Sequence, residues 1–292
     1  MPSLKDVQDK IVGVKKTSQI TSAMNMVASA KLRGAQEKME NFFPYADKFN
    51  QTMSTLSGGG NTDQFPLMEV RDVKTVEIVV VTSDRGLCGS FNSKIIQLAD
   101  QKMREYEAEG KTVSFVCVGK KGHQILKKTG KVRKQYLDIM ANFQMFNARE
   151  IAQDVATGFT SGDADKVEVI YGKFKSVAVQ YADAQDMLPI TPIESDEETE
   201  SETQAVGDYI YEPSTEEIMD VMQPLYLNVI IYNAMLQVGA SEHAARMTAM
   251  DNATSACRDI VKDLTLVFNK ARQAAVTGEL MDIVGGAEAL KG

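Results

Sequence analysis

Apolar residues recur at alternating steps of three and four along the first part of the chain. Between Leu4 and Leu56, thirteen of the sixteen positions reached by these steps are apolar. A heptad pattern sustained over this length predicts a coiled-coil helix rather than a helix of an ordinary globular domain. The sequence SGGG at 57–60 is expected to end this helix.

Three polar residues interrupt this pattern at Ser18, Thr21 and Asn25. The apolar residues of this region stand at neighbouring positions, namely Ile20, Met24 and Val27. We therefore expect the buried face of the helix to rotate locally onto these three side chains.

The C-terminal part of the chain has the same character. The sequence EPSTEE at 212–217 is typical of a helix start, with Ser214 as the N-cap and two glutamates in the first turn. Stepping by threes and fours from Ile218 predicts a seam that includes Met250, Ala253, Cys257, Ile260, Leu264, Val267 and Ala271 and continues to Gly285. A helix of about 70 residues would be about 105 Å long. Its apolar stripe needs a partner, which predicts a long antiparallel coiled coil formed by the N- and C-terminal helices.

Between these helices, apolar runs alternate with helix-like segments. Strands are expected at 75–82, 113–118, 166–172, 174–181 and 187–193, and helices at 91–108, 120–128 and 147–160. This alternation predicts a central Rossmann-like α/β domain with a mainly parallel sheet, whose later strands form an antiparallel edge. The expected fold class is therefore α/β plus coiled coil.

Three segments follow from this reading. They are an N-terminal coiled-coil helix (1–58), a central α/β domain (70–211) and a C-terminal coiled-coil helix (212–292) that pairs with the first. Within the α/β domain, residues 194–208 carry seven acids and no base and lack a core pattern. We expect this acidic segment to be a loop.

The sequence VEIVVVTSDRGLCGSFN at 76–92 has the strand, glycine turn and helix of a nucleotide-binding fold. It lacks both the G-x-G-x-x-G fingerprint and the G-x-x-x-x-G-K-[ST] pattern, whose lysine reaches the phosphates. A tight turn in which Asp84 and Asn92 bind backbone amides is the favoured interpretation.

The remaining reactive residues form no catalytic or metal-binding pattern. Cys88, Cys117 and Cys257 are widely spaced, which indicates buried thiols in a reducing compartment. The histidines are His123 and His243, and neither is placed to form a Cys–His pair. We therefore expect no catalytic residue, no cofactor-binding residue and no metal ligand.

Charge narrows the possible partners. The net charge is −8, which argues against general binding to polyanions. The stretch 120–134 carries seven basic residues and no acid, but no aromatic residue is interleaved for base stacking, so a solvated surface is favoured and no nucleic-acid partner is expected. No apolar run approaches the ~20 residues that span a bilayer, so membrane association is expected only through partner proteins.

Five segments closely resemble the gamma subunits of rotary (F-type) ATP synthases. They are ITSAMNMVASAKLRGAQ (20–36), SDRGLCGSFN (83–92), SEHAARMTAMDNAT (241–254), DLTLVFNKARQAAVTGEL (263–280) and DIVGGAEAL (282–290). The resemblance implies a non-catalytic central rotor shaft, without a cofactor, that couples proton flow through the membrane sector to ATP synthesis or hydrolysis. The implied partners are three alpha and three beta subunits, the epsilon subunit and the proteolipid c-ring.

The same resemblance carries over to four residues. Met24 matches the shaft methionine beside the acidic catch loop of the beta subunit, and Arg246 matches an arginine on the opposite helix near the neck. Arg272 and Gln273 match a C-terminal pair that engages the same subunits. Because the chain begins directly with its helix, we expect a bacterial source and a peripheral position at the cytoplasmic face of the inner (plasma) membrane.

Two functions other than a rotor subunit are compatible with long helices and an α/β domain. One is a nucleotide-dependent enzyme with coiled-coil arms, which the missing phosphate motif disfavours. The other is a coiled-coil scaffold unrelated to energy coupling, which the terminal motifs disfavour. Nucleotide binding by the isolated chain would discriminate between the enzyme and the rotor subunit.

Overall fold

The computed structural model describes residues 3–57, 65–191, 212 and 214–289. The expectation that 194–208 is a loop falls outside these residues. The chain divides into two compact units, one of residues 30–245 and one that joins residues 1–29 to residues 246–292. Two long helices, α1 (Leu4–Ser57) and α6 (Thr215–Ala289), contribute to both units.

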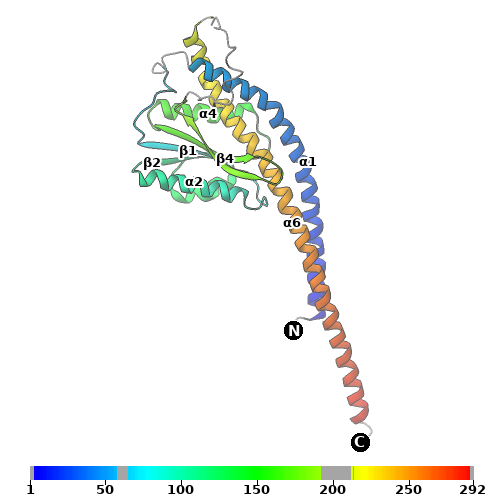
Figure 1. Cartoon of the computed structure of the whole chain (residues 1–292). Helices are drawn as coiled ribbons and strands as arrows, with labels where there is room; N and C mark the ends of the chain where they lie inside the picture. Colours follow the sequence, from blue (N-terminus) through cyan, green and yellow to red (C-terminus); the bar gives the residue numbers. More distant parts are fainter. Residues whose placement is uncertain (1–2, 58–64, 192–211, 213, 290–292) are drawn as a thin grey trace. The chain divides into compact units, whose positions relative to one another are not determined.

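The larger unit contains a five-stranded sheet in the order β3-β2-β1-β4-β5 (Figure 1). Its strands are β1 (Thr75–Val81), β2 (Thr112–Val118), β3 (Val132–Tyr136), β4 (Lys166–Phe174) and β5 (Gln180–Leu188). The first four strands pair in parallel, and β5 pairs antiparallel with β4. The predicted parallel sheet with an antiparallel edge is confirmed.

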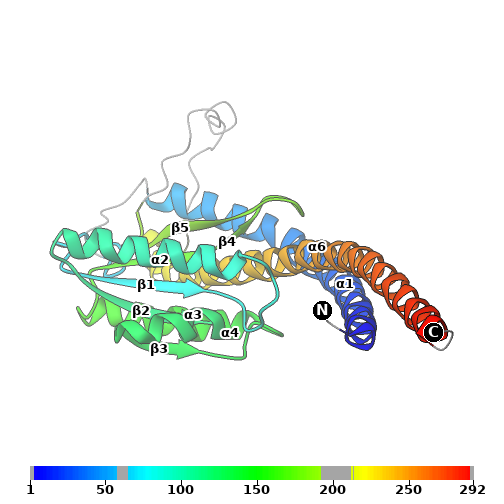
Figure 2. The same ribbon diagram turned by 90° about the horizontal axis from the view of Figure 1, so that it is seen from below.

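Helices cover both faces of this sheet. They are α2 (Phe91–Ala108), α3 (Lys120–Leu126), the short 3-10 helix η2 (Lys127–Thr129) and α4 (Met145–Thr160). Figures 1 and 2 show α2 and α4 on opposite sides of the strands, and α3 contacts α2. Because both faces are covered, six of the seven residues of β1 are buried, as is typical of a central parallel strand.

The expected strands at 174–181 and 187–193 were wrong. Phe174 ends β4, and the chain then turns, with the Val179 amide donating to the carbonyl of Ser176 at 3.2 Å. Val177 and Val179 supplied a strand-like alternation, but their side chains are exposed at this turn. The strand β5 begins only at Gln180 and already ends at Leu188.

The strand β3 was missed because its sequence, VRKQY, looks like part of a solvated basic stretch. It lies at the edge of the sheet, where Tyr136 is buried and Arg133 and Lys134 reach acidic side chains on the same face of the sheet. Charged side chains are a common feature of edge strands, because they discourage pairing with another chain. An edge strand of this kind carries too little apolar signal to be distinguished from a loop.

Within the larger unit, α6 is buried on most sides. Its start is as predicted, since the Ser214 hydroxyl accepts a hydrogen bond from the Glu217 amide at 3.2 Å. The fully buried side chains that follow are those of Met219, Leu227, Ile231, Ala234, Met235 and Val238. A helix that is apolar on all sides belongs in a core, so this part of α6 is a core element rather than one helix of a two-helix coiled coil.

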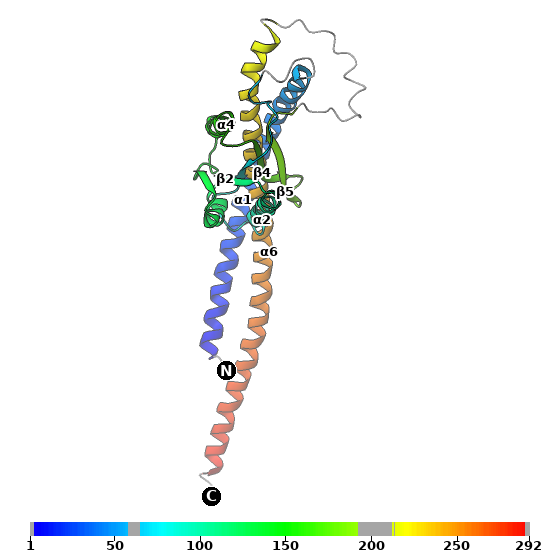
Figure 3. The ribbon, with the colours of Figure 1, turned by 90° about the vertical axis from the view of Figure 1, so that its left-hand side faces the viewer.

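The smaller unit is an antiparallel pair formed by the N-terminal part of α1 and the C-terminal part of α6, which confirms the predicted coiled coil (Figure 3). The hydroxyls of Thr21 and Thr254 are 2.7 Å apart, and Asn25 Nδ2 donates to the carbonyl of Met247 at 2.8 Å. The polar positions of α1 therefore lie in the seam. The predicted rotation of the buried face was wrong, because Ile20 and Val27 are 60% and 57% exposed.

The seam of α6 in this unit follows the predicted one at Met250, Ala253, Cys257, Leu264 and Ala271, and it shifts by one residue at two steps. From Met250 onward, its buried or half-buried residues are Met250, Ala253, Thr254, Cys257, Val261, Leu264, Phe268 and Ala271. The expected seam residues Ile260 and Val267 are 46% and 48% exposed. Counting from the pair Thr21–Thr254, the first residue of α1, Leu4, lies level with Ala271. From Arg272 to Ala289 every residue is exposed, so the seam ends there and does not continue to Gly285.

The corrected seam can be tested with two matched aspartate variants. Ala28 is 2% exposed in the seam, so Ala28→Asp buries an unpaired charge and is expected to destabilise the helix pair by about 2–4 kcal/mol. Ile20→Asp introduces the same charge on the exposed face and should cost less than about 1 kcal/mol. Urea unfolding of the full chain, followed by circular dichroism, measures both values. If Ile20→Asp lowered the free energy of unfolding more than Ala28→Asp, the predicted rotation of the buried face onto Ile20 would be correct after all.

Candidate functional site

In an open α/β sheet a ligand site is expected at the carboxyl ends of neighbouring strands whose connections leave in opposite directions. Here these strands are β1 and β4. The ring of Phe91 lies against Gly172, so closely that a Cβ there would be 2.3 Å from a ring carbon. The Ser241 hydroxyl donates to the Gly172 carbonyl at 3.1 Å, and the Phe174 amide donates to Gln237 Oε1 at 2.9 Å. Side chains of α2 and α6 therefore pack where a nucleotide fold binds its ligand.

The loop that follows β1 is tied down by hydrogen bonds to backbone amides, as predicted. The Asp84 carboxylate accepts from the amides of Lys120, Asp138 and Met140 at 3.0, 3.2 and 3.0 Å. Asn92 Oδ1 accepts from the Ser83 amide at 3.1 Å. These two side chains join the loops that follow β1, β2 and β3. Their polar atoms are thus used in holding the α/β unit together.

The two thiols of the α/β unit, Cys88 and Cys117, are buried and not exposed to reactants. Cys88 is buried, and Asn92 Nδ2 donates to its sulfur at 3.2 Å. Burial raises the pKa of the Cys117 thiol to about 12, so it stays protonated at neutral pH and is a poor nucleophile. Within the described part of the chain, no group of three or more His, Cys, Asp or Glu residues is placed to hold a metal ion.

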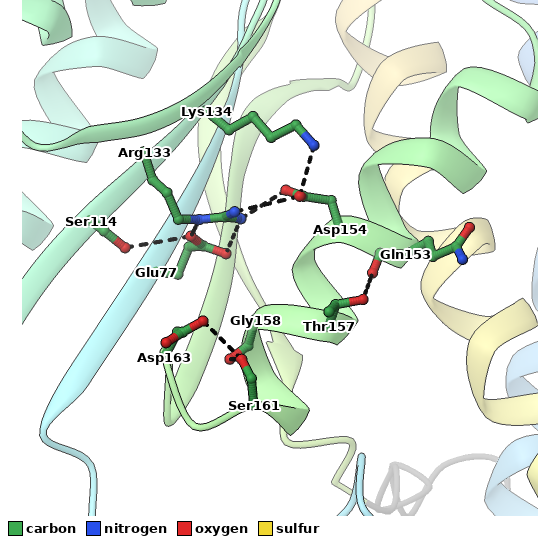
Figure 4. Close-up of polar contacts among 10 residues, drawn as sticks. All are labelled: Glu77, Ser114, Arg133, Lys134, Gln153, Asp154, Thr157, Gly158, Ser161 and Asp163. Atoms are coloured by element: carbon green, nitrogen blue, oxygen red, sulfur yellow. Dashed lines mark hydrogen bonds and ion pairs between the residues drawn. The ribbon is translucent and has the colours of Figure 1, made fainter.

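The strongest polar cluster lies between the sheet and α4 (Figure 4). Glu77 on β1 is only 1% exposed, and Arg133 on β3 donates to its two oxygens at 2.5 and 3.1 Å. The same guanidinium donates to Asp154 on α4 at 2.8 Å, and Lys134 also reaches Asp154 at 2.8 Å. We call these four residues the ionic cluster. Although burial opposes it, hydrogen bonds from Arg133 and Lys134 hold the pKa of Asp154 below its ordinary value.

The ionic cluster balances two carboxylates with two cations and fastens a central strand, an edge strand and a helix to one another. A buried carboxylate held by a bidentate guanidinium is common both in active sites and in structural cross-links. Here each charge is satisfied by another member of the cluster, which fits a structural role. Sequence reasoning missed this cluster because its members lie at 77, 133–134 and 154, far apart in the chain.

The four residues expected from the resemblance do not form one cluster. Met24 is half-buried on α1, and Arg246 is 9% exposed on α6. Arg272 and Gln273 lie in the last part of α6, beyond the end of the seam, and both are exposed. A set of residues distributed along two helices is suited to contacts with large partners rather than to a single binding site.

Sequence reasoning overlooked the outer face of the smaller unit. On α1, Val12, Ile20, Met26 and Val27 are between 45% and 66% exposed, on the side opposite the seam. In the part of α6 that belongs to this unit, the exposed large apolar residues are Ile260, Leu266, Val267, Val276, Leu280, Met281, Ile283 and Val284. The sequence did hold a signal for this face, because these helices contain more apolar residues than a single seam can bury. Apolar side chains exposed in this number indicate a surface that other proteins cover.

Comparison with known proteins decides the family. Residues 3–290 match the family model described as ATP synthase. The chain is 71% identical to the ATP synthase gamma chain of Desulfotalea psychrophila and 51% identical to that of Nitratidesulfovibrio vulgaris strain Hildenborough, each over 100% of both chains. The chain belongs to the ATP synthase gamma family.

Solved structures agree with this assignment. A chain in the central stalk and c-ring structure of the Tetrahymena thermophila mitochondrial ATP synthase is 27% identical, with a TM-score of 0.61 over 80% of this chain and 99% of that one. A chain in the Euglena gracilis mitochondrial ATP synthase shares the fold, with 20% identity, a TM-score of 0.66 and coverage of 98% and 94%. Both solved chains thus share the fold described above.

Proposed function

We propose that this gamma chain is the central rotor shaft of a proton-translocating ATP synthase. It couples proton flow through the membrane sector to conformational change in a catalytic ring of three alpha and three beta subunits. The observation that carries the proposal is full-length similarity to ATP synthase gamma chains, together with a helix pair whose outer face is rich in exposed apolar residues. Such a face suits a shaft that a ring of other subunits surrounds.

A shaft works by contacting its partners differently in different orientations. A ligand or partner shifts a conformational equilibrium only by its differential affinity for the two states. The helix pair supplies the necessary asymmetry, because it presents α1 on one side and α6, with a different sequence, on the other. As the shaft turns, each catalytic subunit in succession meets a different face, so one face favours an open site and another a closed one.

The chain itself is proposed to be non-catalytic, with no cofactor. Two observations support this. Phe91 and α6 occupy the carboxyl edge of β1 and β4, and the polar side chains of the Asp84 loop are engaged with backbone amides. Micromolar affinity of the isolated chain for ATP, with turnover, would contradict this part of the proposal.

The proposed contact residues for the catalytic ring are Met24, Arg246, Arg272 and Gln273. The exposure of Arg272 and Gln273 beyond the seam supports a role in binding partners. The α/β unit, within the segment 70–211, is proposed to contact the epsilon subunit and the c-ring, while segments 1–58 and 212–292 form the shaft.

We further propose a peripheral location at the cytoplasmic face of a bacterial inner membrane. The bacterial origin of the most similar relatives given above supports it. In the described ranges, no helix has the length and apolar character needed to cross a bilayer. Attachment to the membrane is then through the partner subunits alone.

A substitution on the shaft tests the proposed contact. Met24→Lys places a cation beside the acidic catch loop expected on the beta subunit, so ATP-driven proton pumping is expected to fall several-fold while ATP hydrolysis persists. The matched control is Met145→Lys, at a half-exposed methionine on α4, which should leave pumping unchanged. Both rates are measured in inverted membrane vesicles. Normal proton pumping by the Met24→Lys variant would show that Met24 does not contact the catalytic ring.

A further inference from the structure

The short helix α3 and the 3-10 turn η2 present a basic surface with an apolar centre. Ile125 is 49% exposed, and Lys121 and Lys128 stand four residues before it and three after it, on the same side. Lys127 is exposed beside them. We call Lys121, Ile125, Lys127 and Lys128 the α3 patch. An isoleucine held out of the core among lysines has no evident role in packing the α/β unit.

The charges of the α3 patch are not neutralised within the described chain. The other cations of this stretch have acidic partners, because Lys120 pairs with Asp138 at 2.6 Å, Lys131 pairs with Glu107, and Arg133 and Lys134 belong to the ionic cluster. No ion pair to Lys121, Lys127 or Lys128 occurs among the residues that the structure describes. Three surplus cations thus gather on one surface of a chain whose net charge is −8.

The α3 patch is also fixed in position. At its start, the Gly122 amide donates to Thr82 Oγ1 at 2.9 Å, and the Lys120 amide donates to Asp84 at 3.0 Å. At its end, the Thr129 hydroxyl donates to the Leu126 carbonyl at 2.7 Å. The inner face buries Gly122 and Leu126. A surface that is already ordered loses little entropy when it binds a partner of defined shape.

We propose that the α3 patch binds an acidic segment of a partner subunit, with an apolar residue of that segment resting on Ile125. The proposal rests on the proposed function, because the ATP synthase complex supplies the partner. It concerns a surface of the α/β unit, distinct from Met24, Arg246, Arg272 and Gln273 on the long helices. Opposite charges around a small apolar centre set the orientation and the specificity of such a contact.

The observations favour a protein over a lipid surface or nucleic acid. Lipid-binding basic clusters usually hold about 4–8 Lys or Arg residues, and interfacial helices present a broad apolar face. The α3 patch offers three surplus cations and a single exposed apolar side chain. It contains no aromatic residue on which a base could stack. A rigid spacing of this kind matches a carboxylate pattern fixed by a folded partner.

Photo-crosslinking in the intact ATP synthase tests the proposal. The full-length chain carries benzoylphenylalanine in place of Ile125, the complex is purified from membranes and illuminated, and the cross-linked peptides are identified by mass spectrometry. The expected product joins position 125 to a peptide of a partner subunit that is rich in Asp and Glu. A cross-link to lipid, to a peptide without acids or to this chain's own segment 194–208 would overturn the proposal, and so would the absence of a product.

Charge reversal provides the second arm. Lys121→Glu combined with Lys128→Glu should lower the yield of this product roughly three- to tenfold, because attraction becomes repulsion. The matched control, Lys48→Glu combined with Lys175→Glu, changes the charge equally at exposed lysines elsewhere in the larger unit and should leave the yield unchanged. An equal yield in both double variants would count against an electrostatic contact. Co-purification of the alpha and beta subunits reports separately on the proposed function.

Discussion

Gly119→Ala is expected to lower the free energy of unfolding by about 2–4 kcal/mol, one of the two largest effects anticipated for this chain. Gly119 lies between β2 and α3 with φ +94, a backbone conformation that residues other than glycine rarely adopt. A Cβ there would be 2.1 Å from the carbonyl oxygen of Thr82, which is backbone and cannot swing aside. The cost therefore combines about 1–2 kcal/mol for the backbone with a comparable packing term.

The matched control for this substitution is Gly130→Ala. Gly130 also has a positive φ, +72, but a Cβ at this position meets nothing within 4 Å. It should therefore cost only the backbone component of about 1–2 kcal/mol. Urea unfolding of both full-length variants measures the difference. Equal losses would show that the close approach of Gly119 to Thr82 is relieved at no cost, and the tight packing of α3 against the loop after β1 would then be in doubt.

The second large effect is expected from breaking the ionic cluster. Arg133→Met removes the cation that binds both oxygens of the buried Glu77, and should destabilise the chain by about 3 kcal/mol. Arg104→Met is the control, because Arg104 is 74% exposed and pairs with Asp100 on the same helix, where less than about 0.5 kcal/mol is expected. Combining Arg133→Met with Glu77→Gln should restore part of the loss, since the unpaired charge is then gone. Additive losses would contradict a direct coupling.

The pH dependence of the ionic cluster has a definite sign. The pKa of Asp154 is lowered in the folded chain, mainly because its hydrogen bonds to Arg133 and Lys134 outweigh the opposing effect of burial. A lowered pKa contributes stability that is fully present above the unfolded value of about 3.9 and is lost as the pH falls through the folded value. The contribution should therefore stay constant between about pH 7 and 5 and disappear only below about pH 4. The Asp154→Asn variant should therefore lose less stability than the unsubstituted chain when the pH falls below about 4, as measured by urea unfolding.

Local signals predicted the elements best. The capping residue Ser214, the strand-to-helix turn before Phe91 and the amide-binding role of Asp84 all follow from residue types with strong local preferences. The strand β3 lacked such a signal, because an edge strand with adjacent Arg and Lys residues at its centre resembles a loop. The turn at Val177–Val179 gave a false signal, because exposed valines alternate there as they would in a strand.

Two steps of the α6 seam could not be chosen from the sequence. At one step of α6 both Ile260 and Val261 are apolar, so either fits a heptad. The choice depends on how α6 packs against α1, where the hydroxyls of Thr21 and Thr254 meet. The ionic cluster is similar, since it depends on which strands become neighbours. Such features belong to the tertiary structure and leave no local trace in the chain.

The polar contacts in the seam also determine how the two helices respond to axial force. Sliding α6 past α1 by one heptad, about 10 Å, would again place mostly apolar residues opposite one another. It would, however, separate Thr21 from Thr254 and Asn25 from the carbonyl of Met247. These two contacts therefore favour one register of the helix pair over its neighbours, in addition to the packing of both helices in the larger unit.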